Sequence, residues 1–304
     1  MLAREQVKAG REGALAIRHE ELAVLEITGK DRVSWLNGLL TCDLVKHAPG
    51  AAVYGLAVGR NGRVLADATV VFDDQGERLL VAVPRSVVAA LRAHLDQYLV
   101  MEDAEIAPRD DAFVPWAVHG PRSADVLAAA RAAGAPGGTL DRTGFGGAVV
   151  LAPEERAGEV MAALKAAATV GDGAGWEALR LECAVPRFGA DFDDRTYPQE
   201  ATLEKTAVSF DKGCYLGQEV VCMLQMRGHV KRKLASVVLD AAEAPAAGAA
   251  VTDEAGAAVG EVTSATLSSV GRPIAFAMLK LAVAEPGTHV AVGGARGEVV
   301  ARPA

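Results

Sequence analysis

The chain has 304 residues, a length typical of about two domains with room for a third. Hydrophobic residues make up 51% and charged residues 23%, which excludes an intrinsically disordered chain, because this much apolar surface can offset the entropy lost on folding. The net charge of −8 disfavours broad binding to nucleic acid, although it leaves room for a local basic groove.

Membrane spans, signal peptides and common metal motifs are not expected. Charges interrupt every apolar run before it reaches the roughly 20 residues that a membrane span needs. Charged residues near the N-terminus leave no space for the apolar core of a signal peptide, so a cytoplasmic protein is expected. These residues are Glu5, Lys8, Arg11 and Glu12. The cysteines form no C-x-x-C pair, so neither a disulfide framework nor a metal site is expected. They are Cys42, Cys183, Cys214 and Cys222.

The N-terminal part of the chain predicts a β-meander with flanking helices. Alternating, β-branched segments predict strands at 22–27, 53–58, 64–72, 79–83 and 102–106. Apolar residues at helical spacing follow Asp31 and Pro84. Asn61 and Gly62 predict a hairpin turn between two of the strands, because both residue types tolerate a positive φ.

The rest of the chain changes pattern twice. After 108–111, a strand–helix–strand–helix order at 113–119, 121–133, 148–151 and 153–168 predicts a small α+β domain. Residues 176–183 are helical by pattern, whereas 186–211 are polar and irregular, which is more often functional than accidental in a compact protein. From Leu234 onward, short strands separated by glycine and proline predict a small barrel or sandwich.

The stretch 209–219, Ser-Phe-Asp-Lys-Gly-Cys-Tyr-Leu-Gly-Gln-Glu, is the most informative for chemistry. Lys212 lies two residues before Cys214, and a nearby ammonium group or helix N-terminus stabilises a thiolate. The two glycines would let backbone amides approach a ligand, and Gln218 and Glu219 add hydrogen-bonding groups. The alternative is a glycine-rich turn into a helix, with Cys214 as a small buried hydrophobe.

Two carboxylates are candidates for ligand contact. Glu182 lies at the end of a predicted helix, where it could accept N–H bonds from a fused pyrimidine-type ring. A solvated pair with Arg180 is a weak alternative, because residues two apart do not face each other on a helix. Asp67 lies in the middle of a predicted strand, an unusual place for an acid, and it faces either a ligand or the polar side of a half-exposed sheet.

The run 227–233, Arg-Gly-His-Val-Lys-Arg-Lys, forms a local positive patch that could contact a polyanionic ligand tail or RNA phosphates. A solvated surface is the commoner explanation of such a run and is favoured over RNA contact. The other histidines are scattered and are expected to be structural. They are His19, His47, His94, His119 and His289.

At residues 212–219 the sequence K-G-C-Y-L-G-Q-E resembles the motif K-G-C-Y-x-G-Q-E of the YgfZ branch of the YgfZ/GcvT family. The run 28–99 is similar to the first domain of the family. Further residues resemble a run in its folate-dependent aminomethyltransferases. They are Arg180-Leu181-Glu182, Gly189, Asp191, Pro198 and Glu200. The resemblance extends over nearly the whole chain.

The resemblance implies an α+β fold, with three domains in a ring around a central folate cleft. It implies an N-terminal α+β domain over 1–110, completed by about 176–232, and a ferredoxin-like α+β domain over 111–175. A small β-barrel over 233–304 closes the ring.

The resemblance also implies the cofactor, tetrahydrofolate or a one-carbon derivative of it. Cys214 is implied as the functional thiol, with Asp67 as the second catalytic candidate. Further residues are the expected contacts to the folate. They are Glu182, Lys212, Gly213, Tyr215, Gly217, Gln218, Glu219 and Arg227.

Three functions compete. The favoured one is a folate-binding factor in the assembly or repair of iron–sulfur proteins, with an indirect link to tRNA modification, whose partners are folate and iron–sulfur client proteins. The second is a folate-dependent one-carbon transferase, with Asp67 as acid–base or electrostatic group. It is disfavoured because the aminomethyltransferases have two adjacent acids where this chain has Ala66 and Asp67. The third is an RNA-binding module that uses 227–233.

Overall fold

The computed structural model describes residues 1–301. Its helices are Ala3–Glu12 (α1), Arg32–Asn37 (α2), Val88–Asp96 (α3), Ser123–Ala132 (α4), Ala157–Ala167 (α5), Gly173–Glu182 (α6) and Gln218–Met226 (α7). Its strands are Leu15–Arg18 (β1), Leu22–Thr28 (β2), Ala52–Val58 (β3), Val64–Phe72 (β4), Leu79–Pro84 (β5), Glu105–Pro108 (β6), Phe113–His119 (β7), Gly137–Thr139 (β8), Gly147–Pro153 (β9), Thr169–Val170 (β10), Arg232–Leu239 (β11), Ala250–Thr252 (β12), Ala258–Leu267 (β13), Pro273–Lys280 (β14), His289–Val292 (β15) and Ala295–Val300 (β16).

The first sheet has the strand order β3-β4-β5-β2-β6 and contains the predicted meander. Side chains alternate along β4, so that Ala66 and Ala68 belong to the core that also contains residues of α2 and α3. Asp67 and Thr69 consequently face the opposite side of the sheet. The predicted turn joins β3 to β4, and of its two central residues only Gly62 has a positive φ, of +73°.

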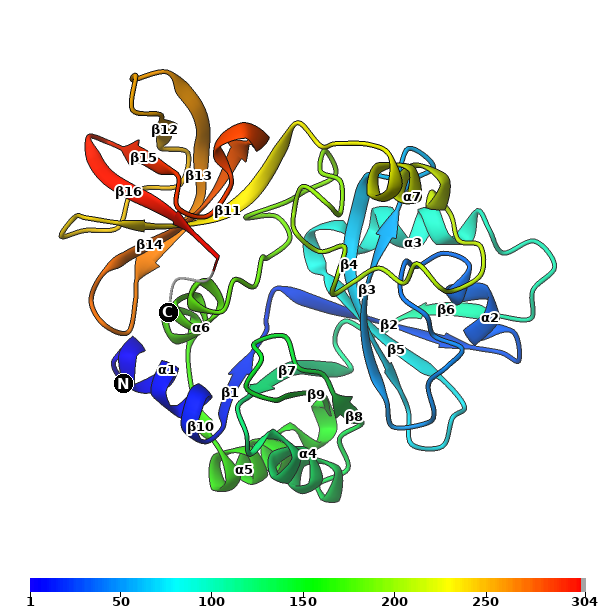
Figure 1. The fold of residues 1–304 in the computed structure, drawn as a ribbon. Helices are drawn as coiled ribbons and strands as arrows, with labels where there is room; N and C mark the ends of the chain where they lie inside the picture. Colours follow the sequence, from blue (N-terminus) through cyan, green and yellow to red (C-terminus); the bar gives the residue numbers. More distant parts are fainter. Residues whose placement is uncertain (302–304) are drawn as a thin grey trace.

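The second sheet has the order β10-β1-β7-β9-β8, and α4 and α5 cover one of its faces (Figure 1). Its strand β1 comes from the N-terminus, and Leu15 pairs with His119 of β7 and with Thr169 of β10. Residues 15–18 therefore lie in the second sheet, although the sequence assigns 1–110 to the first domain. The sequence predicts neither α1 nor β1, because their partners lie far along the chain.

The C-terminal strands form a closed barrel in the order β11-β14-β13-β12-β15-β16. Its interior is filled by apolar side chains, among them Val237, Val262 and Leu279. Closure removes the exposed strand edges that an open sheet of short strands would present. The predicted fold class, α+β with a C-terminal β-barrel, is confirmed.

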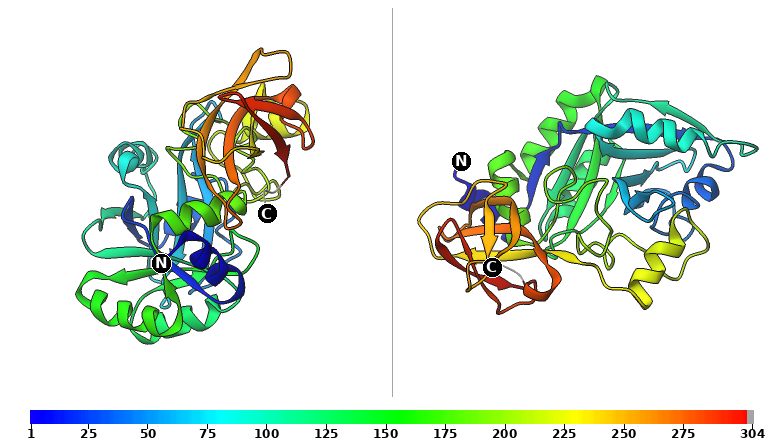
Figure 2. Two further views of the ribbon diagram at one scale, coloured as in Figure 1. Left: turned by 90° about the vertical axis from the view of Figure 1, so that its left-hand side faces the viewer. Right: turned by 90° about the horizontal axis from the view of Figure 1, so that it is seen from above.

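The three bodies are arranged around the middle of the molecule, and α6 lies between the barrel and α1 (Figures 1 and 2). The two sheets pack face to face through a shared apolar cluster that includes Leu80 of β5, Phe113 of β7 and Leu151 of β9. Each large apolar side chain buried in such a layer stabilises the fold by roughly 1.5–3 kcal/mol. Helix α6 packs against α1 on one side and reaches β13 and β14 of the barrel on the other.

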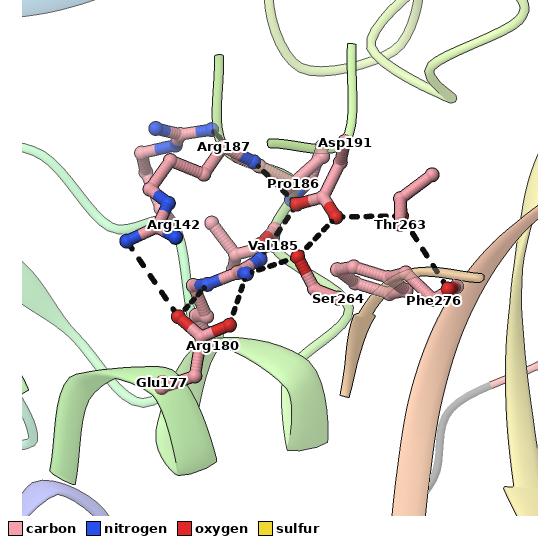
Figure 3. A network of polar contacts seen from close by, with 10 residues as sticks. All are labelled: Arg142, Glu177, Arg180, Val185, Pro186, Arg187, Asp191, Thr263, Ser264 and Phe276. Atoms are coloured by element: carbon pink, nitrogen blue, oxygen red, sulfur yellow. Dashed lines mark hydrogen bonds and ion pairs between the residues drawn. The ribbon is translucent and has the colours of Figure 1, made fainter. Parts of the chain in front are cut away.

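A buried ion pair and its hydrogen bonds join α6 to the barrel (Figure 3). Arg180 of α6 has no exposed surface and donates to Asp191 Oδ2 at 2.7 Å and to Ser264 Oγ of β13 at 2.7 Å. Asp191 also accepts from Ser264 and from Thr263 Oγ1, while Glu177 binds the other edge of the guanidinium. Because burying a charge is costly unless it is paired, this network fixes α6, the chain after it and the barrel together.

Replacing Arg180 by Met tests this role. The substitution leaves the buried carboxylate of Asp191 without its cation, so we expect the free energy of unfolding to fall by about 3–5 kcal/mol. Denaturant titration followed by circular dichroism measures it. The matched control is Arg122→Met, whose exposed pair with Asp125 should contribute less than about 1 kcal/mol. Equal losses in the two variants would contradict the role of Arg180.

Candidate functional site

A cavity lies where the two sheets and α6 meet. Its walls come from the segment between β1 and β2, from β3, β4, β5, β7 and β9, from α6, and from the chain that follows α6. It leaves about 100 Å3 in which a water-sized sphere can be centred. One water needs only about 10–15 Å3 by this measure, so the cavity has room for a small ring or a group of waters.

Asp67, Tyr54 and Arg142 form a polar corner of the cavity. The Tyr54 hydroxyl donates to Asp67 Oδ2 at 3.0 Å, and the Arg142 guanidinium lies 3.7 Å from the centroid of the Tyr54 ring. Burial raises the pKa of Asp67 above its ordinary value, although the charge of Arg142 opposes the shift. A partly buried acid with a perturbed pKa beside a cation, in a cavity, is typical of a functional site.

Three rings form a second wall of the cavity. His119 stacks on Trp176, with centroids 4.7 Å apart and planes 5° apart, and the edge of His19 meets the same indole at 5.6 Å. His19 Nδ1 also pairs with Glu21 Oε1 at 2.7 Å. Burial lowers the pKa of His119 to about 3, so its ring is neutral at physiological pH. The wall therefore combines flat apolar faces with ring nitrogens.

Lys212 anchors the loop that carries Cys214. Its ammonium group donates to the carbonyl oxygens of Asn37 at 2.6 Å, of Leu40 at 2.8 Å and of Cys42. An ammonium group has three donors, so all of them are used. Burial lowers the pKa of Lys212 to about 8. Lys212 thus ties the loop to the turn after α2, and its ammonium is not turned toward a ligand in the cavity.

Other residues of the loop 212–219 also hold its shape. Tyr215 is buried, and its backbone N–H donates to the side-chain oxygen of Gln218 at 3.3 Å. Gly217 has a φ of +77°, and a Cβ there would lie 2.3 Å from the carbonyl oxygen of Gly59. Cys214 is exposed, together with its neighbour Gly213 and with Glu219. The alternative of a buried Cys214 is therefore wrong, and the loop presents this thiol to solvent.

The structure does not bring Glu182 into the cavity. Its carboxylate is fully buried between Arg11 of α1, at 2.7 Å, and the backbone N–H of Ser269 in the barrel. Trp176, which does line the cavity, lies six positions earlier on the same helix and points to a different side. Of the sequence-predicted residues, the cavity wall contains Asp67 and none of the residues 212–219. The folate contacts assigned to the loop and to Glu182 stay predictions.

The basic run 227–233 follows α7 and is divided in the structure. Arg227, Lys231 and His229 are exposed, whereas Arg232 is tied to Glu200 at 3.1 Å. None of these residues lines the cavity. None of the helices in the described part of the chain has both the length and the apolar character that crossing a bilayer requires.

Comparisons with known proteins settle the family. A model of the GCVT N-terminal domain matches residues 2–212, and a model of the glycine cleavage T-protein C-terminal barrel domain matches residues 232–304. The chain belongs to the glycine cleavage T-protein family. The resemblance seen in the sequence is thereby confirmed.

The named relatives of the chain include both aminomethyltransferases and tRNA-modifying proteins. The chain is 29% identical to an aminomethyltransferase from Streptomyces coelicolor, over 96% of this chain and 86% of that protein. It is 28% identical to the tRNA-modifying protein YgfZ from Yersinia pseudotuberculosis, over 75% of this chain and 72% of that protein. The solved aminomethyltransferase T from Bartonella henselae shares its fold, with a TM-score of 0.83 at 20% identity, over 99% of this chain and 89% of that chain.

Several cavity residues escape the sequence analysis. They are Tyr54, Arg142, His119, Trp176 and Arg187. Trp176 and His119 look like ordinary members of a helix and a strand, and only the packing of α6 on the second sheet brings them together. Arg187 falls in the irregular segment 186–211, which the sequence analysis marks as functional. That signal could therefore have found this residue.

The four cysteines should differ in reactivity. With iodoacetamide at pH 8, we expect Cys214 to be alkylated first, because it is exposed, and Cys42 last. Cys42 is buried, and burial raises the pKa of its thiol to about 11. Peptide mass spectrometry of a time course measures the order, and a sample in guanidinium, where all four should react alike, is the control. Equal rates for Cys42 and Cys214 in the native protein would contradict the structure.

His119 should make the protein sensitive to acid. The unfolded ring binds a proton below its ordinary pKa of 6.5, whereas the folded ring does so only near 3, so stability is lost as the pH falls through that window. At pH 5 the loss relative to pH 7.5 is about 2 kcal/mol. Urea titrations measure the free energy of unfolding at both pH values. The difference between the two values should be smaller by this amount in His119→Phe than in the wild type. A variant as acid-sensitive as the wild type would contradict a neutral buried His119.

Proposed function

We propose that the chain binds tetrahydrofolate in the cavity between the two sheets. The observation that carries this proposal is the composition of the walls, which combine the Trp176–His119 stack with the carboxyl group of Asp67. Small-molecule sites typically have this form, mostly apolar and aromatic with a few placed polar groups. The family to which the chain belongs, and its aminomethyltransferase relatives, support the same ligand.

The polar groups of the cavity fit the pterin ring of a folate, the part for which the cavity has room. Asp67 can accept N–H groups of the pterin, as acidic side chains accept from the amino groups of bases. Arg187 lines the same cavity with a half-exposed side chain, and it supplies a cation of the kind that binds carboxylates, which a glutamate tail carries. When bound, tetrahydrofolate supplies a carrier for one-carbon units.

Cys214 is the functional thiol in this proposal, and the protein acts in the assembly or repair of iron–sulfur proteins. The exposure of Cys214, on a loop that Lys212, Tyr215 and Gly217 hold in shape, supports it. A thiol in this position can reach a group on another macromolecule. One relative is named a tRNA-modifying protein. The proposal therefore includes an indirect role in tRNA modification.

A one-carbon transferase is the second candidate. Asp67, with its raised pKa and its bond from Tyr54, is a suitable group to hold or move a proton in the cavity. The relatives named aminomethyltransferase favour it too. Formation of methylenetetrahydrofolate from a panel of small amine donors separates this candidate from the first. An RNA-binding module is less favoured, because Glu200 already binds Arg232 of the basic run.

The ligand is tested by anaerobic calorimetric titration of the chain with tetrahydrofolate. We expect saturable binding by the wild type and a dissociation constant at least about tenfold higher for Asp67→Asn, since hydrogen bonds to charged groups contribute about 1.5–3 kcal/mol. Asp240→Asn, an exposed change in the barrel, is the matched control and should bind as the wild type does. Absence of binding by the folded wild type would refute the proposed ligand.

The same titration separates the thiol from the ligand site. Cys214→Ser should bind tetrahydrofolate as the wild type does, because Cys214 does not line the cavity. In cells that lack this protein, Cys214→Ser should nevertheless fail to restore the activity of iron–sulfur enzymes that the wild type restores. Restoration by Cys214→Ser would remove the thiol from the proposed function, whatever the titration shows.

A further inference from the structure

His119 is a buried polar group whose hydrogen-bonding capacity the protein does not use. Its side chain is buried, with 4% of its surface exposed, and it lines the cavity. Neither Nδ1 nor Nε2 has a hydrogen-bond partner within residues 1–301. Leaving a buried polar group unpaired costs about 1–3 kcal/mol, so native proteins rarely keep one without a reason.

The position of this ring is fixed by the elements around it. His119 ends β7, a central strand, and its backbone is paired with Leu15 of β1 and with Gly147 of β9. Trp176 covers one face of the imidazole in a nearly parallel stack. Rotations of the ring other than a 180° flip, which keeps its plane, would break this stack.

The groups around His119 favour a neutral ring. Burial disfavours its charged form, and His19 and Arg142 add positive charge nearby, whereas the carboxylate of Asp141 opposes them. A neutral imidazole offers one N–H donor and one lone pair. An unpaired donor and acceptor that border a cavity are suited to the edge of a flat heterocycle, whose own donors and acceptors lie in the plane of its ring.

We propose that His119 is a specificity-determining residue, whose imidazole hydrogen-bonds the edge of a heterocyclic ring bound in the cavity. The inference rests on the proposed function, because the ring it assigns to His119 is the pterin of tetrahydrofolate. In this arrangement His119 hydrogen-bonds the ring, Trp176 orients His119, and the half-exposed Arg187 is left for the tail.

The decisive variant is His119→Phe, which keeps a flat ring for the stack on Trp176 and removes both nitrogens. We expect its dissociation constant for tetrahydrofolate to rise at least about tenfold, because the ring edge loses its partner. At pH 7.5 its thermal midpoint should equal or exceed that of the wild type, since the change removes an unpaired polar group. A purely structural histidine would give the opposite result, a lower midpoint with unchanged affinity. His289→Phe, an exposed change on β15, is the control.

A second ligand shows which part of the folate His119 contacts. Tetrahydropterin has the ring without the aminobenzoyl-glutamate tail, and the affinity of His119→Phe for it should fall by the same factor. A loss seen only with the full ligand would overturn the assignment to the ring. Unchanged affinity of His119→Phe, with Asp67→Asn weakened, would overturn this inference alone. A folded wild type that binds neither ligand would overturn the proposed function, and this inference with it.

Discussion

The buried pair of Arg180 and Asp191 is the constraint on which the rest of the molecule depends, because it decides where α6 can lie. Both side chains are fully buried, so each requires the other, and the hydroxyl groups of Thr263 and Ser264 complete the set from the barrel. Trp176 lies one turn before Arg180 on α6 and lines the cavity. A pair that joins the barrel to the ring therefore also builds one wall of the cavity.

In the loop around Cys214, too, a buried charged group holds a segment in place, and this group is the ammonium of Lys212. Lys212 looks like a group that would activate the thiol, since it is two residues away in sequence. Its three N–H groups instead donate hydrogen bonds to backbone carbonyl oxygens at the end of α2 and in the turn after it. Tyr215 adds a buried ring beside Tyr54 of the cavity wall, in one apolar cluster. Lys212, Tyr215 and Gly217 thus hold the shape of the motif, and Gly213, Cys214 and Glu219 are the residues of it that are exposed.

Sequence patterns predict this fold well where the information is local. The strand 113–119 and the strand 64–72 have the predicted bounds, because alternation and flanking turns mark both ends. The barrel follows from short strands between glycines. Strand β1 and the helix before it escape prediction, since only their distant partners in the second sheet and in α6 give them their places.

The site is less accessible to sequence reasoning than the fold. Asp67 stands out because an acid in a strand is unusual, and it does line the cavity. Glu182 also stands out, but Arg11, from the other end of the chain, takes its carboxylate. Nothing local marks His119, which looks like the last residue of an ordinary strand. In the described part of the chain its ring nitrogens have no hydrogen-bond partner, and a missing contact leaves no trace in a sequence.

The cavity and the exposed loop are separate parts of the surface, because Cys214 does not line the cavity. The cavity is enclosed by the two sheets and α6, whereas Cys214 stands outside its walls on a separately anchored loop. A partner that reaches the thiol need not enter the cavity, and a small molecule in the cavity need not leave for it. The cavity and the thiol loop nevertheless share one apolar cluster, which contains Tyr54 of the cavity wall and Tyr215 of the loop.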